Sequence, residues 1–175
     1  MEKKLPQIKI REWNEKPRTK LRFIKIGDIF CYQFSEEMFV FGQILGKVNV
    51  GHVIQFFDFF QASPTITVEE LSRAQFIGKP IIIDSYTLFD RSPVWFWQII
   101  GHQVDFDPSP FKDLAFKWGD PNGLHFGKVW LDGRREPKIF SREEVEDLDW
   151  EACVGSIVYN RILEEELASR GNKGV

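Results

Sequence analysis

The sequence predicts an α+β domain, built on a strongly bent antiparallel β-sheet that starts as a meander, with a C-terminal helical segment packed on it. Three observations predict this fold class. Apolar residues alternate with a period of two through the first half of the chain, which is typical of strands with one buried face. Short polar or glycine-bounded breaks separate these runs, as in hairpins. A capping-box pattern at Ser141–Glu144 then precedes apolar residues at mostly helical spacing.

We expect the first three strands at residues 29–34, 38–45 and 52–60. Glu36-Glu37 separates the first two, and Gly46 to Gly51 separates the next two, so adjacent strands pair as hairpins. Gly42 lies inside the second strand, where a missing side chain indicates a bulge or a bend. The third strand has aromatic rings on both faces: Phe56, Phe57, Phe59 and Phe60. A strand that is apolar on both faces is buried on both, so the sheet is curled on itself or covered by a helix.

The middle of the chain alternates short elements with turns. Thr67-Val68-Glu69-Glu70 is a capping-box start for a short helix that ends before Gly78. Further strands are expected at 80–83, 95–100 and 125–131. Residues 105–123 have the composition of a loop, although they include the apolar piece 114–118. We expect Trp95 and Trp97 in the core.

The last part of the chain predicts one or two helices that start at Ser141, with an interruption at Asp149 or Gly155. The length of 175 residues favours one core. We therefore divide the chain into a basic leader arm at 1–20, a single α+β domain at 21–168 and a flexible tail at 169–175.

Charge is distributed unevenly along the chain, although the net charge is only -3. Residues 1–25 hold nine basic against three acidic residues, a charge of +6, whereas residues 141–168 hold nine acidic against two basic residues, a charge of -7. An acidic face suits a basic protein partner, because complementary potentials raise association rates. The basic arm suggests an alternative function, a nucleic-acid-binding module that uses the arm and exposed aromatic residues. A solvated leader strand explains the same charges, so we do not expect direct nucleic-acid binding.

The sequence offers little for catalysis. Cys31 and Cys153 have apolar neighbours and no ligand spacing, so we expect two buried thiols and neither a disulfide nor a zinc site. The segment from His102 to Asp107 could supply an imidazole and two carboxylates to a metal, but it also reads as a surface loop. Ser85 and Ser92 lack the Gly-x-Ser-x-Gly elbow, and phosphate-binding glycine motifs are absent from the sequence. We expect no enzymatic activity, no cofactor and no metal.

The chain has neither a run of ~20 apolar residues nor a secretory signal peptide at its start. A cytoplasmic protein without a membrane partner is therefore expected.

Three segments of the chain carry a resemblance to a known family. They are Lys25-Ile26-Gly27-Asp28-Ile29-Phe30, then Phe39-Val40-Phe41-Gly42-Gln43-Ile44-Leu45, and later Trp97-Gln98-Ile99-Ile100-Gly101. In this order they resemble the bacterial immunity protein 26 family, and the similarity in the order of elements runs from Leu21 to Leu167.

The resemblance implies a small immunity protein encoded beside a polymorphic or contact-dependent toxin. It would bind the toxin's carboxy-terminal domain, a nuclease in many such systems, and neutralise it by stoichiometric, non-catalytic blocking of the active site. A nuclease domain is commonly basic, so an acidic surface would suit it. The family supplies no catalytic residues. As partner-binding residues we expect Glu143, Glu144, Glu146 and Asp147 in the C-terminal helix, and Asp105 and Asp107 in the preceding loop.

Overall fold

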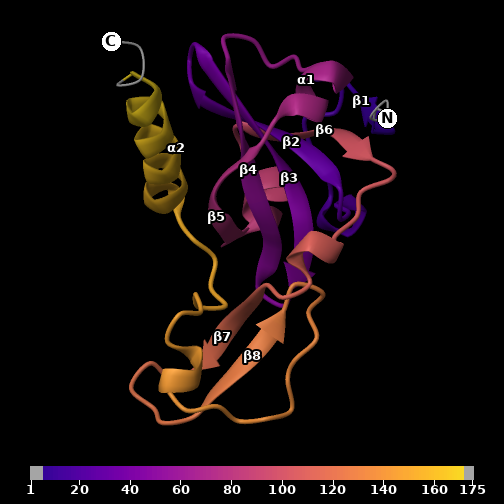
Figure 1. Cartoon of the computed structure of the whole chain (residues 1–175). Helices are drawn as coiled ribbons and strands as arrows, with labels where there is room; N and C mark the ends of the chain where they lie inside the picture. Colours follow the sequence, from indigo (N-terminus) through magenta and orange to yellow (C-terminus); the bar gives the residue numbers. More distant parts are fainter. Residues whose placement is uncertain (1–5, 172–175) are drawn as a thin grey trace, which may run out of the picture.

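The computed structural model describes residues 6–171, and residues 1–5 of the expected arm and 172–175 of the expected tail lie outside them. It contains a six-stranded antiparallel sheet in the order β1-β6-β2-β3-β4-β5 and a separate two-stranded sheet, β7-β8 (Figure 1). With a C-terminal helix added, the fold class is α+β, as the sequence predicts.

The strands of the larger sheet are β1 (Ile8–Ile10), β2 (Asp28–Ser35), β3 (Met38–Val48), β4 (Gly51–Gln61), β5 (Phe76–Ile83) and β6 (Trp97–Gln103). The smaller sheet consists of β7 (Ala115–Gly119) and β8 (Phe126–Trp130). The α-helices are α1 (Val68–Arg73) and α2 (Ser156–Gly171). The short turns are η1 (Leu21–Phe23), the π-helical η2 (Tyr86–Arg91), η3 (Ser109–Phe111) and η4 (Glu143–Val145).

Strands β2 to β5 form the meander that the sequence predicts, each antiparallel to the next. The pairing of β3 with β4 shifts register between Val40 and Gly42, so the expected irregularity at Gly42 is confirmed. A β-carbon at Gly42 would clash with the Phe30 ring and lie 2.5 Å from the carbonyl oxygen of Gln55. Glycine is therefore required where the Phe30 ring packs directly on the backbone of β3. Such register shifts recur in β2, β3 and β4 and bend the sheet.

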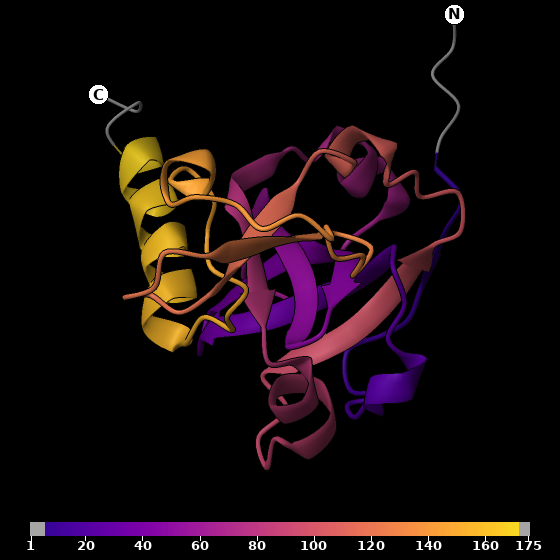
Figure 2. The ribbon, with the colours of Figure 1, turned by 90° about the horizontal axis from the view of Figure 1, so that it is seen from below.

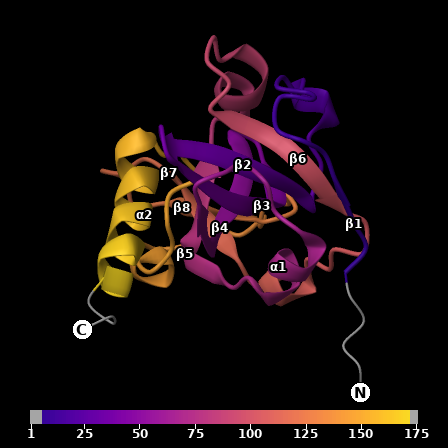
Figure 3. The same cartoon turned by 90° about the horizontal axis from the view of Figure 1, so that it is seen from above.

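Both faces of the larger sheet are buried. On one face, Phe30 and Phe56 pack with Trp97 and with residues of η2 and α2, including Phe89 and Leu163. The other face contains a second cluster, which α1 covers in part: Ile29, Cys31, Phe39, Phe41, Phe57, Ile66, Leu71 and Ile100. Figures 2 and 3 show η2 and α1 on opposite sides of the sheet. The sheet is thus covered on two sides, and Trp97 lies in the core as expected. Trp95, also expected there, is only partly buried and lies just before β6 begins.

Helix α1 begins as the sequence predicts. The backbone N–H of Thr67 donates to Glu70 Oε2 at 2.7 Å, and the N–H of Glu70 donates to Thr67 Oγ1 at 3.2 Å. These reciprocal bonds form the capping box. The helix ends at Arg73, after six residues.

The capping box expected at Ser141 forms, because the Ser141 N–H donates to Glu144 Oε2 at 2.8 Å and the Glu144 N–H donates to Ser141 Oγ at 3.4 Å. The expectation of a helix directly after it is wrong, since only the single turn η4 follows. Helix α2 begins at Ser156, directly after Gly155, one of the two expected points of interruption. The chain between them bonds to β7 instead, because the Lys117 N–H donates to the carbonyl of Asp149 at 2.8 Å and the Glu151 N–H donates to the carbonyl of Lys117 at 2.7 Å. The backbone groups of Asp149 and Glu151 are therefore bonded to β7 and are not available for the hydrogen bonds of a helix. Glu143, Glu144, Glu146 and Asp147 therefore do not lie on a long helix.

Two smaller expectations also differ from the structure. The apolar piece 114–118, expected within a loop, contributes most of β7, because β8 supplies the pairing that makes it a strand. Cys153 is exposed rather than buried, and its thiol donates to the carbonyl of Val50 at 3.0 Å, whereas Cys31 is buried as expected.

The close approach at Gly42 predicts that G42A destabilises the protein by about 2–3 kcal/mol, the cost of overpacking a dense core. Denaturant unfolding followed by circular dichroism measures the change. The matched control is G155A, because a β-carbon at Gly155 meets no atom within 4 Å, and it should stay within about 0.5 kcal/mol of the parent. Equal effects of the two variants would contradict this account of Gly42.

Candidate partner-binding surface

A cavity lies against the face of the sheet that α1 covers. We call it the sheet-face cavity; it has a volume of about 590 Å³ and lies between α1, the end of β6 and η3. Aromatic residues from four segments line it: Phe57, Phe76, Phe106 and Phe111. The Phe57 and Phe76 rings stack with their centroids 4.9 Å apart, and Phe111 packs edge-on against Phe76 at 5.7 Å. The cavity is therefore mainly apolar and built on the sheet itself.

Two glutamine amides meet inside the sheet-face cavity. Gln43 of β3 is buried, and its Nε2 donates to Gln103 Oε1 at 3.0 Å and to the carbonyl of Gly27 at 3.4 Å. Buried amides need such partners, because an unpaired one costs free energy. Both glutamines line the cavity, so a hydrogen-bonded pair of amide groups lies among its apolar walls.

Two of the six expected binding residues, Asp105 and Asp107, lie at the edge of this cavity and are exposed. Asp105 Oδ1 accepts from the backbone N–H of Gln7 at 3.0 Å, which ties the loop after β6 to the N-terminal segment. The carboxylate of Asp107 accepts from the hydroxyl of Ser109 at 2.6 Å and from its N–H at 2.9 Å. These hydrogen bonds lower the pKa of Asp107, the hydroxyl bond most, so its carboxyl is ionised at neutral pH.

The other four expected residues, Glu143, Glu144, Glu146 and Asp147, are exposed on and just after η4. None of them lines the sheet-face cavity, so the structure divides the six acids into two groups. Glu144 pairs with Lys138 Nζ at 2.7 Å, and this contact is the main cause of its lowered pKa. The acids at η4 form a charged edge without a cavity beneath them.

Basic residues on β8 and in the segment that follows it offset part of the acidic charge. Arg135 pairs with Glu151 at 2.7 Å, as Lys138 does with Glu144. Other cations of this region lie over aromatic rings, with Lys128 at 4.2 Å from the Phe140 centroid and Arg142 at 5.4 Å from that of Phe126. The summed formal charge of residues 141–168 therefore overstates the negative electrostatic potential at this surface. The basic residues from Arg134 to Arg142 are the signal in the sequence that could have shown this.

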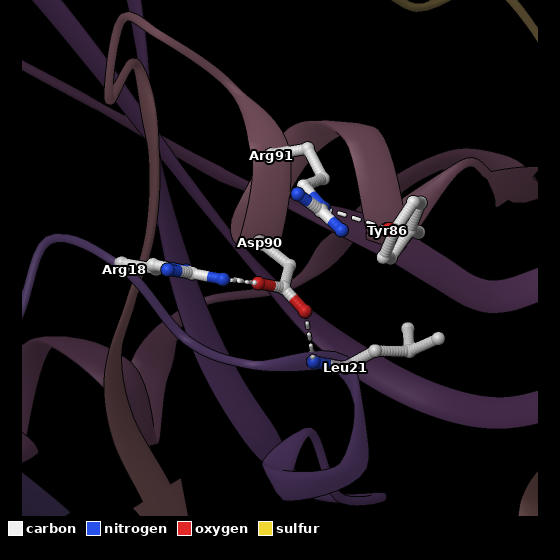
Figure 4. A network of polar contacts seen from close by, with 5 residues as sticks. All are labelled: Arg18, Leu21, Tyr86, Asp90 and Arg91. Carbon is white, nitrogen blue, oxygen red and sulfur yellow. Dashed lines mark hydrogen bonds and ion pairs between the residues drawn. The ribbon is translucent and has the colours of Figure 1, made fainter.

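The described part of the expected leader arm is bonded to the sheet. Strand β1 pairs with β6, and the Trp13 ring packs edge-on against Phe39 with centroids 5.5 Å apart. Farther on, Arg18 Nη2 lies 2.6 Å from Asp90 Oδ1, and the N–H of Leu21 donates to Asp90 Oδ2 at 3.1 Å (Figure 4). The bond from Leu21 and the Arg18 guanidinium hold the pKa of Asp90 below its usual range. The division of the chain into arm, domain and tail stays a prediction.

The remaining hydrogen bond in Figure 4 lies within η2, the π-helical turn against which this segment packs. Arg91 Nε donates to Tyr86 Oη at 2.7 Å across η2, and the Arg91 guanidinium lies 5.2 Å from the centroid of the same ring. The Thr19 N–H donates to the carbonyl of Phe89 at 3.0 Å. Arg18 is thus engaged within the protein.

Histidines take part in two close polar pairs. His102 Nδ1 lies 2.9 Å from Asp28 Oδ1, so the imidazole faces β2 rather than Asp105 and Asp107. Burial is the largest cause of the raised pKa of Asp28. Within residues 6–171, no group of three or more His, Cys, Asp or Glu side chains is arranged to hold a metal ion.

The second pair, which sequence reasoning missed, joins His52 and Ser85. His52 Nδ1 lies 2.9 Å from Ser85 Oγ, and both residues are only 1% exposed. A serine and a histidine at hydrogen-bond distance can form a nucleophile and its base. Both residues line a small cavity of about 80 Å³ between β4 and the start of η2. Burial lowers the pKa of His52 to about 4.

The fold and this surface define an α+β protein with an apolar cavity edged by carboxylates, which is the character of a binding site. Comparison with protein families gives the class a name: the family model of Immunity protein 26 matches residues 25–124, more than half of the chain. The chain belongs to the immunity protein 26 family, as the resemblance indicated. No curated protein and no solved structure matches it.

The family match covers β2 to β7 and leaves β1, β8 and α2 outside. It begins at Lys25, the first residue of the motif that carried the resemblance. Among the described helices, none is sufficiently long and apolar to span a membrane.

Burial of His52 predicts how stability depends on pH. In the unfolded chain its pKa is about 6.5, and in the folded protein about 4, so between these values the unfolded chain binds more protons. The contribution of His52 to the free energy of unfolding is therefore fully present when the pH is above the pKa of the unfolded chain. This contribution is lost as the pH falls toward 4. From pH 7 to pH 5 the loss should be roughly 2 kcal/mol.

The measurement is urea unfolding at several pH values for the parent, H52Q and H125Q. We expect H52Q to remove this part of the pH dependence, even where it lowers stability at pH 7. H125Q changes an exposed histidine and should keep the parent slope. A slope that H52Q leaves unchanged would refute the role of His52.

Proposed function

We propose that this immunity protein neutralises a cognate bacterial toxin domain by stoichiometric, non-catalytic binding that blocks the toxin's active site. Membership of the immunity protein 26 family is the observation that carries the proposal. The structure adds support, because its candidate site is a cavity with charged edges.

The proposed toxin is a basic nuclease. Its phosphate-binding cleft would be positive, and exposed carboxylates can occupy such a cleft in place of nucleic acid. Among the described residues, Glu143, Glu146 and Asp147 make no ion pair, unlike Glu144. Of the six expected residues, these three, with Asp105 and Asp107, therefore keep their charge available to a partner.

The nucleic-acid-binding alternative has less support. Arg18 of the basic segment pairs with Asp90, and Trp97, which could have stacked on a base, is 3% exposed in the core. Neither residue is free for a nucleic acid in this conformation. We therefore keep toxin neutralisation as the proposed function.

The direct test is to co-express the protein with the toxin-like carboxy-terminal domain encoded beside its gene. Cell survival and a one-to-one complex in size-exclusion chromatography with light scattering are the expected results. Toxicity that persists without any complex would refute neutralisation of that toxin.

The contribution of charge can be measured separately with E143Q/E146Q. Because exposed charges act mainly on the rate of encounter, we expect the association rate constant at low salt to fall about threefold to tenfold. The control, E164Q/E165Q, removes two exposed carboxylates from α2 and should change the rate less. Equal effects would show that only net charge matters.

A further inference from the structure

We propose that the sheet-face cavity receives a basic segment of the toxin domain, with a lysine or arginine whose apolar stem lies along the phenylalanine rings and whose charged end reaches Asp105 and Asp107. This inference rests on the proposed function and names the surface and the chemistry of the contact. It differs from a general acidic face, because it places the affinity in one cavity rather than in the summed charge.

The walls of the cavity suit a long side chain with a cationic end. Its volume of about 590 Å³ falls within the range of cavities that bind ligands and is large enough for more than one side chain. Lysine and arginine bury their methylene stems on apolar surfaces, and their charged ends are attracted to aromatic faces. Phe57, Phe76, Phe106 and Phe111 provide both kinds of contact.

The charge of the residues around the cavity favours a positively charged ligand. Among residues 6–171, the lining of the cavity includes no lysine, arginine or histidine, and its only charged residues are Asp105 and Asp107. Neither aspartate pairs with a basic side chain among the described residues. Both carboxylates therefore retain acceptor capacity for a cation from outside.

The glutamine pair inside the cavity adds a contact for a peptide. A primary amide carries two N–H donors and a carbonyl acceptor, so the bond from Gln43 to Gln103 Oε1 leaves the donors of Gln103 available. A backbone carbonyl of a bound segment can accept from them. The guest that satisfies rings, carboxylates and amide together is a basic peptide segment rather than an isolated ion.

The cavity is also held in shape before binding. Ile29, Gln43 and Phe57 come from β2, β3 and β4, the central strands of the sheet. All lining residues except Pro6 and Ile8 lie within the range matched by the family model. A site on paired strands loses little conformational freedom on binding, which favours affinity.

The test uses the full chain and the toxin domain, with S72W to fill the cavity. Ser72 lies on α1, lines the cavity and donates its hydroxyl to the carbonyl of Glu69 at 2.7 Å. Ser169 is the matched control, since its hydroxyl on α2 donates to the carbonyl of Glu166 at 2.8 Å. In calorimetric titration we expect S72W to weaken binding at least tenfold and S169W less than threefold. Thermal melts of the free variants show whether S72W still folds.

A second pair of variants tests the charge. Asp107 and Asp120 each accept from the N–H two residues further on at 2.9 Å, and asparagine keeps that bond. We expect D107N to weaken binding about tenfold and to reduce its dependence on salt. D120N, at the turn after β7, should leave both unchanged.

The outcomes separate the two proposals. A parent protein that forms no complex refutes the proposed function for that toxin. If the parent binds and both S72W and D107N bind equally well, the proposed role of the cavity is refuted. The proposed neutralisation of the toxin then still stands.

Peptide display provides a measurement without the toxin. A random peptide library selected on the parent should yield sequences with lysine or arginine beside an apolar residue, and these should not bind S72W. Selection of acidic peptides, or of peptides that bind S72W equally, would also refute the cavity.

Discussion

The structure depends on the fact that its central strands are apolar on both faces, so each face must be covered. Helix α2 and the η2 turn cover one face. The other face has α1, whose six residues make a helix only ~9 Å long, whereas six strands span roughly 24 Å. Trp13 covers part of the remainder, and the β7–β8 sheet covers another part through Phe116 and Val129. The sheet-face cavity is what this short helix leaves open, so the cavity follows from the way the core is closed.

Much of this arrangement could be predicted from the sequence, because its signals are local. The alternation from residue 29 to 60, the capping box at Thr67 and the glycine inside β3 each depend on neighbours along the chain. The C-terminal region could not be predicted in the same way. Its capping box at Ser141 forms, but the backbone bonds of Asp149 and Glu151 go to Lys117, 32 residues before Asp149, and no local pattern contains that pairing.

The candidate site shows the same limit. Asp105 and Asp107 could be selected as exposed acids from the loop composition, yet the cavity beside them could not. It needs rings from β4, β5 and η3 in contact, and only the folded sheet brings Phe57, Phe76 and Phe111 together. Charge summed along the sequence was misleading for a related reason. Two of the acids after Ser141, Glu144 and Glu151, pair with cations of the segment that follows β8, so the effect of this charge depends on contacts between segments.

These contacts imply different roles for the two groups of acids in the proposed complex. Exposed carboxylates at η4 are screened by solvent and salt, so they act mainly on the rate of encounter. Asp105 and Asp107 lie beside apolar walls that a bound segment would seal from water, where a charge-assisted bond contributes more. Affinity would then come from rings and sealed charges together, and specificity from the shape of one cavity. A basic nuclease with a flat surface would contact the acids at η4. It could not place a side chain in the cavity beside Asp105 and Asp107.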